Sequence, residues 1–423
     1  MSLKRELLLT LLLTLPPQVS AEDDWGDDWG DEEATQQAAS SWQLSGFVEA
    51  AYSDFLQHNI VASNNALNEF RARVEVDYSH QLFEFSAKGD LLYDDVLSDT
   101  IWHTRQFYLA ASPLANLDIK IGRQILTWGT GDYVFLNDLF AKDWQSFFAG
   151  RDDPYLKAPS DSVRLTGYLG DFTLDLAWTP DFTADNYLTG ERFSFYSPQL
   201  QQAVAPAADF AVNTTDADQW SVRIATNKDG IEYALYGYRG FWNTPQGVTD
   251  QSINSQGVAY FPKMNAWGSS LRMPLGSGLF NSEFSIYNSI EDSQGDNPQI
   301  ANGQLRFLLG YEQEVAKNLT ASVQYYLEKT ADYQPQILVD EYRQLLTLRL
   351  RYTAMQQKLT YSLFSFYSPT DNDGYIRPSI SYRKDDHWLF SLGANLFNGK
   401  DAFSFFAQHQ DNSNAWLRIR YSF

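Results

Sequence analysis

Hydrophobic and polar side chains alternate at every second position through most of the chain. The last nine residues, "AWLRIRYSF", place Leu417, Ile419 and Tyr421 on one side and Arg418 and Arg420 on the other. A period of two is that of an extended strand, whose successive side chains point to opposite faces. Helical spacing is not sustained beyond the N-terminal region. The pattern therefore predicts an all-β protein.

Eighteen segments carry this alternation, and the links between them are long and short in turn. The predicted strands are 42–56, 68–79, 82–93, 104–112, 117–124, 161–169, 172–178, 218–226, 231–242, 259–273, 279–288, 304–313, 319–329, 342–353, 358–367, 375–383, 387–396 and 415–423. Short links contain turn residues, as in the "NKDG" of residues 227–230. The segment "AFSFFAQ" at 402–408 also alternates, but a further strand there would move Phe423 to the opposite edge of the sheet. We therefore place 402–408 in the last long link.

Two folds could use such strands. In a soluble sandwich the apolar faces would meet in a core, whereas in a membrane barrel they would face lipid around a charged, water-filled interior. Alternating long and short links are typical of outer-membrane barrels, which have short periplasmic turns and longer external loops. Because backbone groups in lipid must be paired, the last strand has to pair with the first. We predict a single-domain, closed antiparallel transmembrane β-barrel of eighteen strands, with sixteen as the alternative count.

The N-terminal region differs from the rest of the chain. The apolar run "LLLTLLLTL" follows Lys4 and Arg5 and precedes the small residues "VSA", which is the pattern of a secretory signal peptide. We assign residues 1–21 to this peptide. Residues 22–41 are strongly acidic and contain "DDWG" twice, so we expect a disordered periplasmic tail. The barrel is expected to occupy residues 42–423.

Composition narrows the function. Aromatic residues make up 15% of the chain, a supply suited to the aromatic belts at the two edges of a bilayer. Cysteine is absent and the net charge is −22. The first fact excludes disulfides and cysteine metal sites, and the second argues against nucleic acid as a partner. We expect no metal and no cofactor.

Two segments resemble known outer-membrane proteins. The terminal "YSF", with Tyr421 and Phe423 as its aromatic residues, resembles the signal by which the barrel-assembly machinery recognises its substrates. The segment "IGRQILTWGTGDYVFLNDLF" (Ile121 to Phe140) resembles the Gly-Arg-Gln and Trp-Gly segment of a family of poorly characterised proteobacterial outer-membrane barrels. The resemblance implies a porin or an accessory export barrel in the bacterial outer membrane, with no agreed substrate to carry over.

Charged residues recur on the face of the sheet opposite the apolar one. Candidate lumen or constriction residues are Glu49, Arg71, Arg73, Arg349, Arg351, Arg418 and Arg420 on strands, with Trp128 and Asp132 in a long link. Facing rows of opposite charge across a water-filled constriction select solutes by charge. The same residues can also brace the wall as cross-strand ion pairs. Since Glu49 has inward parity on the first strand, we expect it near Arg418 or Arg420.

The link 125–160 is too long for a simple hairpin, and loops of this length usually fold against something. We expect it to fold into the barrel and narrow the pore; the alternative is an external lid. Other long links carry carboxylates, such as Asp94, Asp95 and Asp99. We expect these acids to be solvated, since no spacing matches a dedicated calcium loop; the alternative is that divalent cations bound to lipopolysaccharide bridge them. An outer-membrane barrel implies outer-membrane lipid and lipopolysaccharide as surroundings.

Three functions fit these observations. The first is a porin for small hydrophilic solutes. The second is an accessory barrel of an export or lipid-trafficking pathway, which would bind a periplasmic partner through residues 22–41. The third is a barrel hydrolase using His103 near Thr104 or His409 near Ser413, but no Gly-x-Ser-x-Gly segment supports it. We favour the porin and expect no enzymatic activity.

Overall fold

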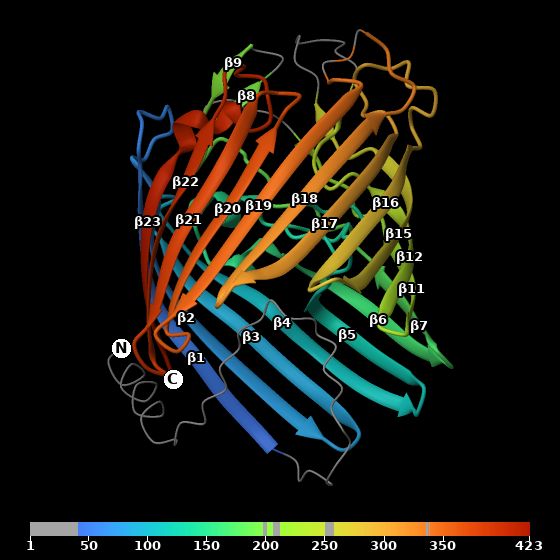
Figure 1. Cartoon of the computed structure of the whole chain (residues 1–423), viewed down its shortest axis with the longest axis vertical. Coiled ribbons are helices and arrows are strands. Elements are labelled where there is room, and N and C mark those ends of the chain that lie inside the picture. The colour runs from blue at the N-terminus through green and yellow to red at the C-terminus, as the bar shows by residue number, and fades with distance from the viewer. Residues whose placement is uncertain (1–40, 198–200, 206–211, 250–257, 336, 338) are drawn as a thin grey trace, which may run out of the picture.

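The protein forms one closed β-sheet that curls into a barrel (Figure 1). This computed structural model describes residues 41–197, 201–205, 212–249, 258–335, 337 and 339–423. Eighteen antiparallel strands follow one another around the barrel in chain order, which confirms the predicted fold class. The predicted signal peptide and acidic tail lie outside the described residues, except for Ser41, which begins the first strand.

The strands of the barrel are β1 (Ser41–Phe55), β2 (Asn65–His80), β3 (Phe83–Asp94), β4 (Asp99–Leu114), β5 (Leu117–Ile125), β6 (Pro159–Leu169), β7 (Phe172–Thr179), β11 (Gln219–Lys228), β12 (Ile231–Phe241), β15 (Lys263–Leu275), β16 (Gly278–Ser289), β17 (Gln304–Ala316), β18 (Leu319–Thr330), β19 (Tyr342–Ala354), β20 (Leu359–Ser368), β21 (Asp373–Arg383), β22 (Trp388–Asn398) and β23 (Asn414–Ser422). The links contain the short strands β8 (Phe195–Ser197), β9 (Gln202–Val204), β10 (Val212–Asn213), β13 (Gly247–Val248) and β14 (Ala259–Tyr260). They also contain the helix α2 (Trp144–Ala149) and the 3-10 helices η2 (Asp153–Leu156) and η3 (Ala407–Asn412). No helix in the described part of the chain is long and apolar enough to cross a membrane.

Two predicted boundaries are wrong. The predicted strand 259–273 is divided, because β14 pairs with β10 and β13 outside the barrel and only β15 joins the wall. The predicted strand 104–112 begins earlier, at Asp99, because its hairpin with β3 closes at the pair Asp94 and Asp99. The link before β4 is therefore short, and His103 lies in a strand and not in a link.

The barrel closes where β1 and β23 pair. Phe47 to Phe55 face Asn414 to Ser422 in an antiparallel register. Gly46 and Phe423 exchange two backbone hydrogen bonds, with N···O distances of 3.0 and 2.9 Å. Gly46 and Phe423 therefore form the last hydrogen-bonded pair of the seam.

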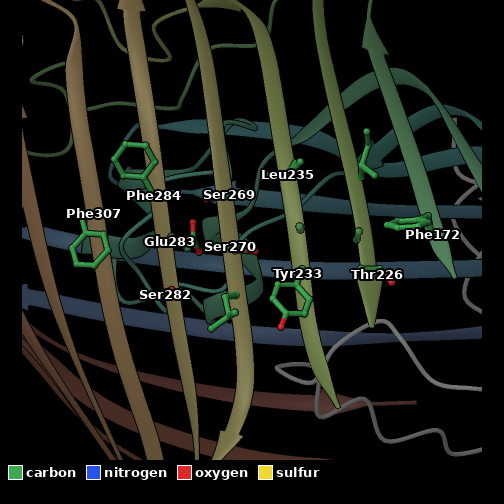
Figure 2. Close-up of a pocket in the computed structure, with 14 residues that line it drawn as sticks. Phe172, Thr226, Tyr233, Leu235, Ser269, Ser270, Ser282, Glu283, Phe284 and Phe307 are labelled. Atoms are coloured by element: carbon green, nitrogen blue, oxygen red, sulfur yellow. The ribbon is translucent and has the colours of Figure 1, made fainter. Parts of the chain in front are cut away.

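The two faces of the wall differ as the alternation predicts. Leu417 and Ile419 are 48% and 39% exposed on the outside, whereas Arg418 between them is buried on the inside. Figure 2 shows the same rule on β16, where the ring of Phe284 projects from the outer face and Glu283 points the other way. The hollow in that view, about 330 Å³ in volume, is lined mostly by outward apolar side chains of neighbouring strands. It is therefore a dip in the lipid-facing wall and not part of the interior.

Candidate functional site: a passage beside the inward loop

The link between β5 and β6 runs through the inside of the barrel, and residues 126–158 are called the inward loop below. Asp143 caps the first turn of α2 by accepting a hydrogen bond from Ser146 N at 2.8 Å. Gly150 ends the helix with a φ of 84°, and a Cβ there would lie 2.3 Å from the side chain of Trp416. Only glycine can let the loop approach β23 this closely.

Aromatic packing fixes the middle of the inward loop to the wall. The ring of Phe148 lies 5.1 Å from that of Phe397 and 5.6 Å from that of Tyr375. Tyr133 lies 4.5 Å from Phe364 in an edge-to-face arrangement. The interior of this region is apolar and packed, because the loop fills it as expected. Four inward side chains of β20 to β22, Phe364, Phe366, Tyr375 and Phe397, form the aromatic surface that receives the loop.

Two asparagines bind the end of α2. The carbonyl oxygen of Phe148 accepts hydrogen bonds from Asn395 Nδ2 at 2.9 Å and Asn414 Nδ2 at 3.0 Å. Carbonyl groups in the last turn of a helix lack partners within that helix. Neighbouring strands β22 and β23 therefore satisfy this one inside the aromatic cluster.

An ionic network joins the loop to the seam. Glu49 Oε2 lies 2.7 Å from Arg420 Nη2, which is the contact expected from their parity. Asp152 of the inward loop lies 2.8 Å from Arg420 and 3.3 Å from Arg418. Burial raises the pKa of Asp152, but the two guanidinium groups outweigh it and hold the pKa well below its usual value. Arg418 and Arg420 of the seam thus hold the loop through the ionised carboxylate of Asp152.

Arg71 and Arg73 lie on the inner face of β2 and share Asp90, at 2.9 and 2.6 Å. Arg71 also pairs with Glu69 at 3.0 Å. Tyr155 of the inward loop stacks against both, with its ring centroid 4.2 and 5.0 Å from their guanidinium carbons. Its hydroxyl donates to Asp90 at 2.9 Å. Burial raises the pKa of Tyr155, so the phenol stays a neutral donor.

Of the remaining predicted charged residues, Asp132 and Arg349 are paired inside the barrel, and Arg351 lies apart from them. Arg349 pairs with Asp132 at 3.2 Å and with Glu312. Ser322 on β18 donates a hydrogen bond to Asp132 at 3.2 Å. Arg351 is exposed on the same face of β19, two residues nearer the strand end. The structure therefore brings Asp132 and Arg349 together as an anchor and leaves Arg351 outside it.

Trp128 packs against the wall. Its ring lies 4.9 Å from Phe140 and 6.2 Å from Tyr236, and it also packs against Ala225 and Ala234. The side chain is half-buried between the inward loop and β11 and β12. Trp128 therefore fixes the start of the inward loop by packing against β11 and β12.

Sequence reasoning missed Arg105. Strict alternation from the outward Phe107 places Arg105 outward, but a β-bulge beside Gly89 turns it inside. It donates to the carbonyl oxygens of Pro154 at 3.0 Å and Lys157 at 2.8 Å. Sequence periodicity alone cannot reveal such a reversal. A bulge of this kind is seen only in the pairing of the strands.

A cavity of about 920 Å³ lies between the inward loop and the wall formed by β2 to β6. Its volume is large enough for a small organic solute. His103 and Tyr155 line it together with charged side chains. These are Arg71, Arg105, Arg123, Arg151, Arg192, Asp94, Asp143, Asp161 and Glu191. On the opposite side the aromatic cluster closes the space between loop and wall.

Positive charge exceeds negative charge beside this cavity. One connected cluster holds six cationic side chains and four carboxylates. It consists of Arg71, Arg73, Lys88, Arg105, Arg151, Arg192, Glu69, Glu75, Asp90 and Asp94. Arg105 donates to backbone carbonyls and shares no carboxylate in this cluster. The cluster therefore gives the cavity wall a positive field.

The histidines considered for catalysis are poorly placed for it. His103 and Thr104 are neighbours on β4 and point to opposite faces, and the Thr104 hydroxyl accepts from Trp102 Nε1 at 3.1 Å. His409 is 5% exposed, and its Nδ1 lies 3.1 Å from Asn412 Nδ2. The Ser413 hydroxyl lies 3.0 Å from the backbone N of Phe397. The described residues also contain no group of three or more histidine, aspartate or glutamate side chains placed to hold a metal ion.

Comparison with known proteins finds similarity of fold alone. No family model matches the sequence, and no curated protein matches it. Among solved structures, OccAB3 of Acinetobacter baumannii matches with a TM-score of 0.56 at 9% identity, over 90% of this chain and 99% of that one. OccAB4 of the same organism matches with a TM-score of 0.55 at 10% identity, over 92% and 99%.

A third similar structure is OccK5 (OpdH) of Pseudomonas aeruginosa, with a TM-score of 0.53 at 10% identity, over 90% of this chain and 97% of that one. These neighbours are Gram-negative outer-membrane porins. The chain therefore has the fold of an outer-membrane porin barrel. At this low identity the similarity concerns the fold alone. It says nothing about the residues that line the cavity of this chain.

We predict that acid weakens the packing around His409. Burial lowers the pKa of His409 to about 4, whereas an exposed histidine titrates near 6.5. Between pH 6.5 and pH 4 the unfolded chain takes up a proton at His409 that the folded protein does not. The free energy of unfolding therefore falls as the pH drops through this range. The loss between pH 7 and pH 5 is about 2 kcal/mol. Urea unfolding in detergent at both pH values measures it.

The matched variant is His409→Gln, which has no titrating ring. Between pH 7 and pH 5 its free energy of unfolding should fall by about 2 kcal/mol less than that of the original protein, because the His409 contribution is absent. Equal losses in the two proteins would show that His409 is not buried as a neutral ring.

Proposed function

We propose that the protein is an outer-membrane channel through which small hydrophilic solutes diffuse. The observation that carries the proposal is the cavity of about 920 Å³ beside an inward loop in an eighteen-stranded barrel. Barrels of sixteen to eighteen strands are wide enough for an aqueous channel. The porin fold of the structural neighbours supports the same function. The inward loop narrows the channel and leaves the route beside β2 to β6.

The charges beside that route favour negatively charged solutes. The connected cluster holds six cationic side chains and four carboxylates. The cavity lining itself holds five guanidinium groups and four carboxylates. Charged side chains at the narrowest part of a pore discriminate more strongly than those at its mouth, because little water screens them. The acidic residues of the outer rim therefore matter less for selectivity than this cluster.

The two alternative functions receive less support. A hydrolase needs a histidine within hydrogen-bond reach of a nucleophile, and His103 and Thr104 point to opposite faces of β4. An accessory barrel would bind a periplasmic partner through residues 22–41, nearly all of which lie outside the described residues. The channel is the function that uses the features of the interior.

We also propose that Tyr421 and Phe423 form the signal read by the barrel-assembly machinery, and that lipopolysaccharide surrounds the outer rim. Phe423 is 39% exposed beside Gly46 at the foot of the seam, where another protein can reach it. Deleting Phe423 should lower the amount of heat-modifiable barrel in the outer membrane several-fold. An unchanged amount in membrane fractions would refute the assembly role.

The channel is tested by recording single molecules of the purified protein in a planar bilayer. We expect stepwise conductance and, in a gradient of potassium chloride, a reversal potential that favours chloride. Arg105→Gln should reduce the preference for chloride because it removes the guanidinium that shares no carboxylate in the cluster. Arg105→Lys keeps the charge and should retain it. Silent membranes with correctly folded protein would contradict the proposed function.

A further inference from the structure

Glu283 is a buried carboxylate in the middle of β16. It is 2% exposed, and its side chain points into the barrel while Phe284 beside it faces outward (Figure 2). No lysine, arginine or histidine of the described chain forms an ion pair with it. Burying a carboxylate is costly unless hydrogen-bond donors replace the water it loses. The donors must therefore come from neutral groups around it.

All of these donors belong to the inward loop. Oε1 accepts from Gly131 N at 2.8 Å, from Thr130 Oγ1 at 3.1 Å and from Thr130 N. Oε2 accepts from Asn137 Nδ2 at 2.7 Å and from Asn137 N at 3.2 Å. Successive backbone N–H groups of this kind form an anion-binding nest. Here the anion is a side chain of the wall.

The local sequence explains the shape of the nest. Gly129 has a φ of 87°, and a Cβ there would lie 3.1 Å from Glu283 Oε1. A Cβ on Gly131 would lie 2.3 Å from the carbonyl oxygen of Val134. The glycines in "WGTGD" thus let the backbone wrap closely around the carboxylate.

Other inward positions of β16 bind the same stretch of loop. Asn281 Nδ2 donates to Thr130 O at 2.9 Å. Ser285 Oγ donates to Asn137 Oδ1 at 2.6 Å, and Tyr287 OH donates to Leu136 O at 2.5 Å. These side chains alternate along one face of the strand with Glu283 among them. Four inward positions of one strand therefore hold the part of the loop from Thr130 to Asn137.

We propose that Glu283 is the positioning residue that holds the inward loop against β16 and thereby keeps the passage open beside β2 to β6. The inference rests on the proposed channel function, which it deepens. The carboxylate supplies only acceptors, and the nest supplies only donors. Glutamine has nearly the same shape, but its NH2 group meets N–H and O–H donors whichever way the amide is turned. Glu283→Gln therefore breaks part of the nest without emptying the site.

The first experiment measures loop release without relying on transport. The chain contains no cysteine, so Val134→Cys provides a single reporter, in a buried position between the two parts of the nest. A charged methanethiosulfonate reagent should modify this cysteine slowly. Adding Glu283→Gln should increase the rate at least about tenfold, the factor that corresponds to 1.4 kcal/mol.

The matched control is Glu84→Gln, which changes an exposed carboxylate on β3 in the same way. It should leave the rate of modification unchanged. A second variant, Asn137→Ala, removes a donor from the loop side and should increase the rate to a smaller extent. Heat-modifiable migration on gels verifies that each barrel is folded. If Glu283→Gln does not fold, Asn137→Ala alone decides the question.

The second experiment records single channels of the same variants. Glu283→Gln should broaden the distribution of conductance and add transient closures, because a released loop moves across the passage. Folded variants whose reporter stays as protected as in the parent would overturn the inference. Faster modification in a protein that conducts no ions in any form would support the positioning role and refute the channel.

Discussion

Backbone hydrogen bonding in lipid is the constraint on which the rest of this structure depends. Every strand must have a neighbour on both sides, and the pairing of β1 with β23 meets that requirement. Closure in turn creates an interior whose lining consists of every second residue. Eighteen strands enclose more space than strand side chains alone can fill. The inward loop occupies that space, so the barrel's function depends on how the loop is held.

Contacts with four parts of the wall hold the inward loop. Aromatic rings pack against β20 to β22, the carboxylate of Asp152 binds the arginines of the seam, and the Trp-Gly-Thr-Gly-Asp segment wraps Glu283 on β16. On the fourth side, beside β2 to β4, Tyr155 and Arg151 of the loop bind Asp90 and Glu69, and a cavity lies next to these contacts. We therefore place the proposed passage on this side, next to the arginine cluster.

The sequence was sufficient for the eighteen strands of the wall, apart from two boundaries, for the seam, and for a contact of Glu49 with Arg418 or Arg420, because each follows from a period of two and from closure. It was insufficient for contacts that depend on what fills the interior. Alternation shows that Phe364 and Tyr375 share a side of the sheet but not that a loop covers them. Arg105 was missed because a bulge reverses its direction. Trp128 and Asp132 were identified, but their role as anchors required the position of the loop.

The central claim is that solutes pass beside the arginine cluster. Its most direct test is a single-channel recording of His103→Cys, since His103 lines the cavity and the chain has no other cysteine. Attachment of a bulky thiol reagent should reduce the current of an open channel in one step, while the parent protein should be unaffected. An open channel whose current stays constant after complete modification would show that the passage lies elsewhere.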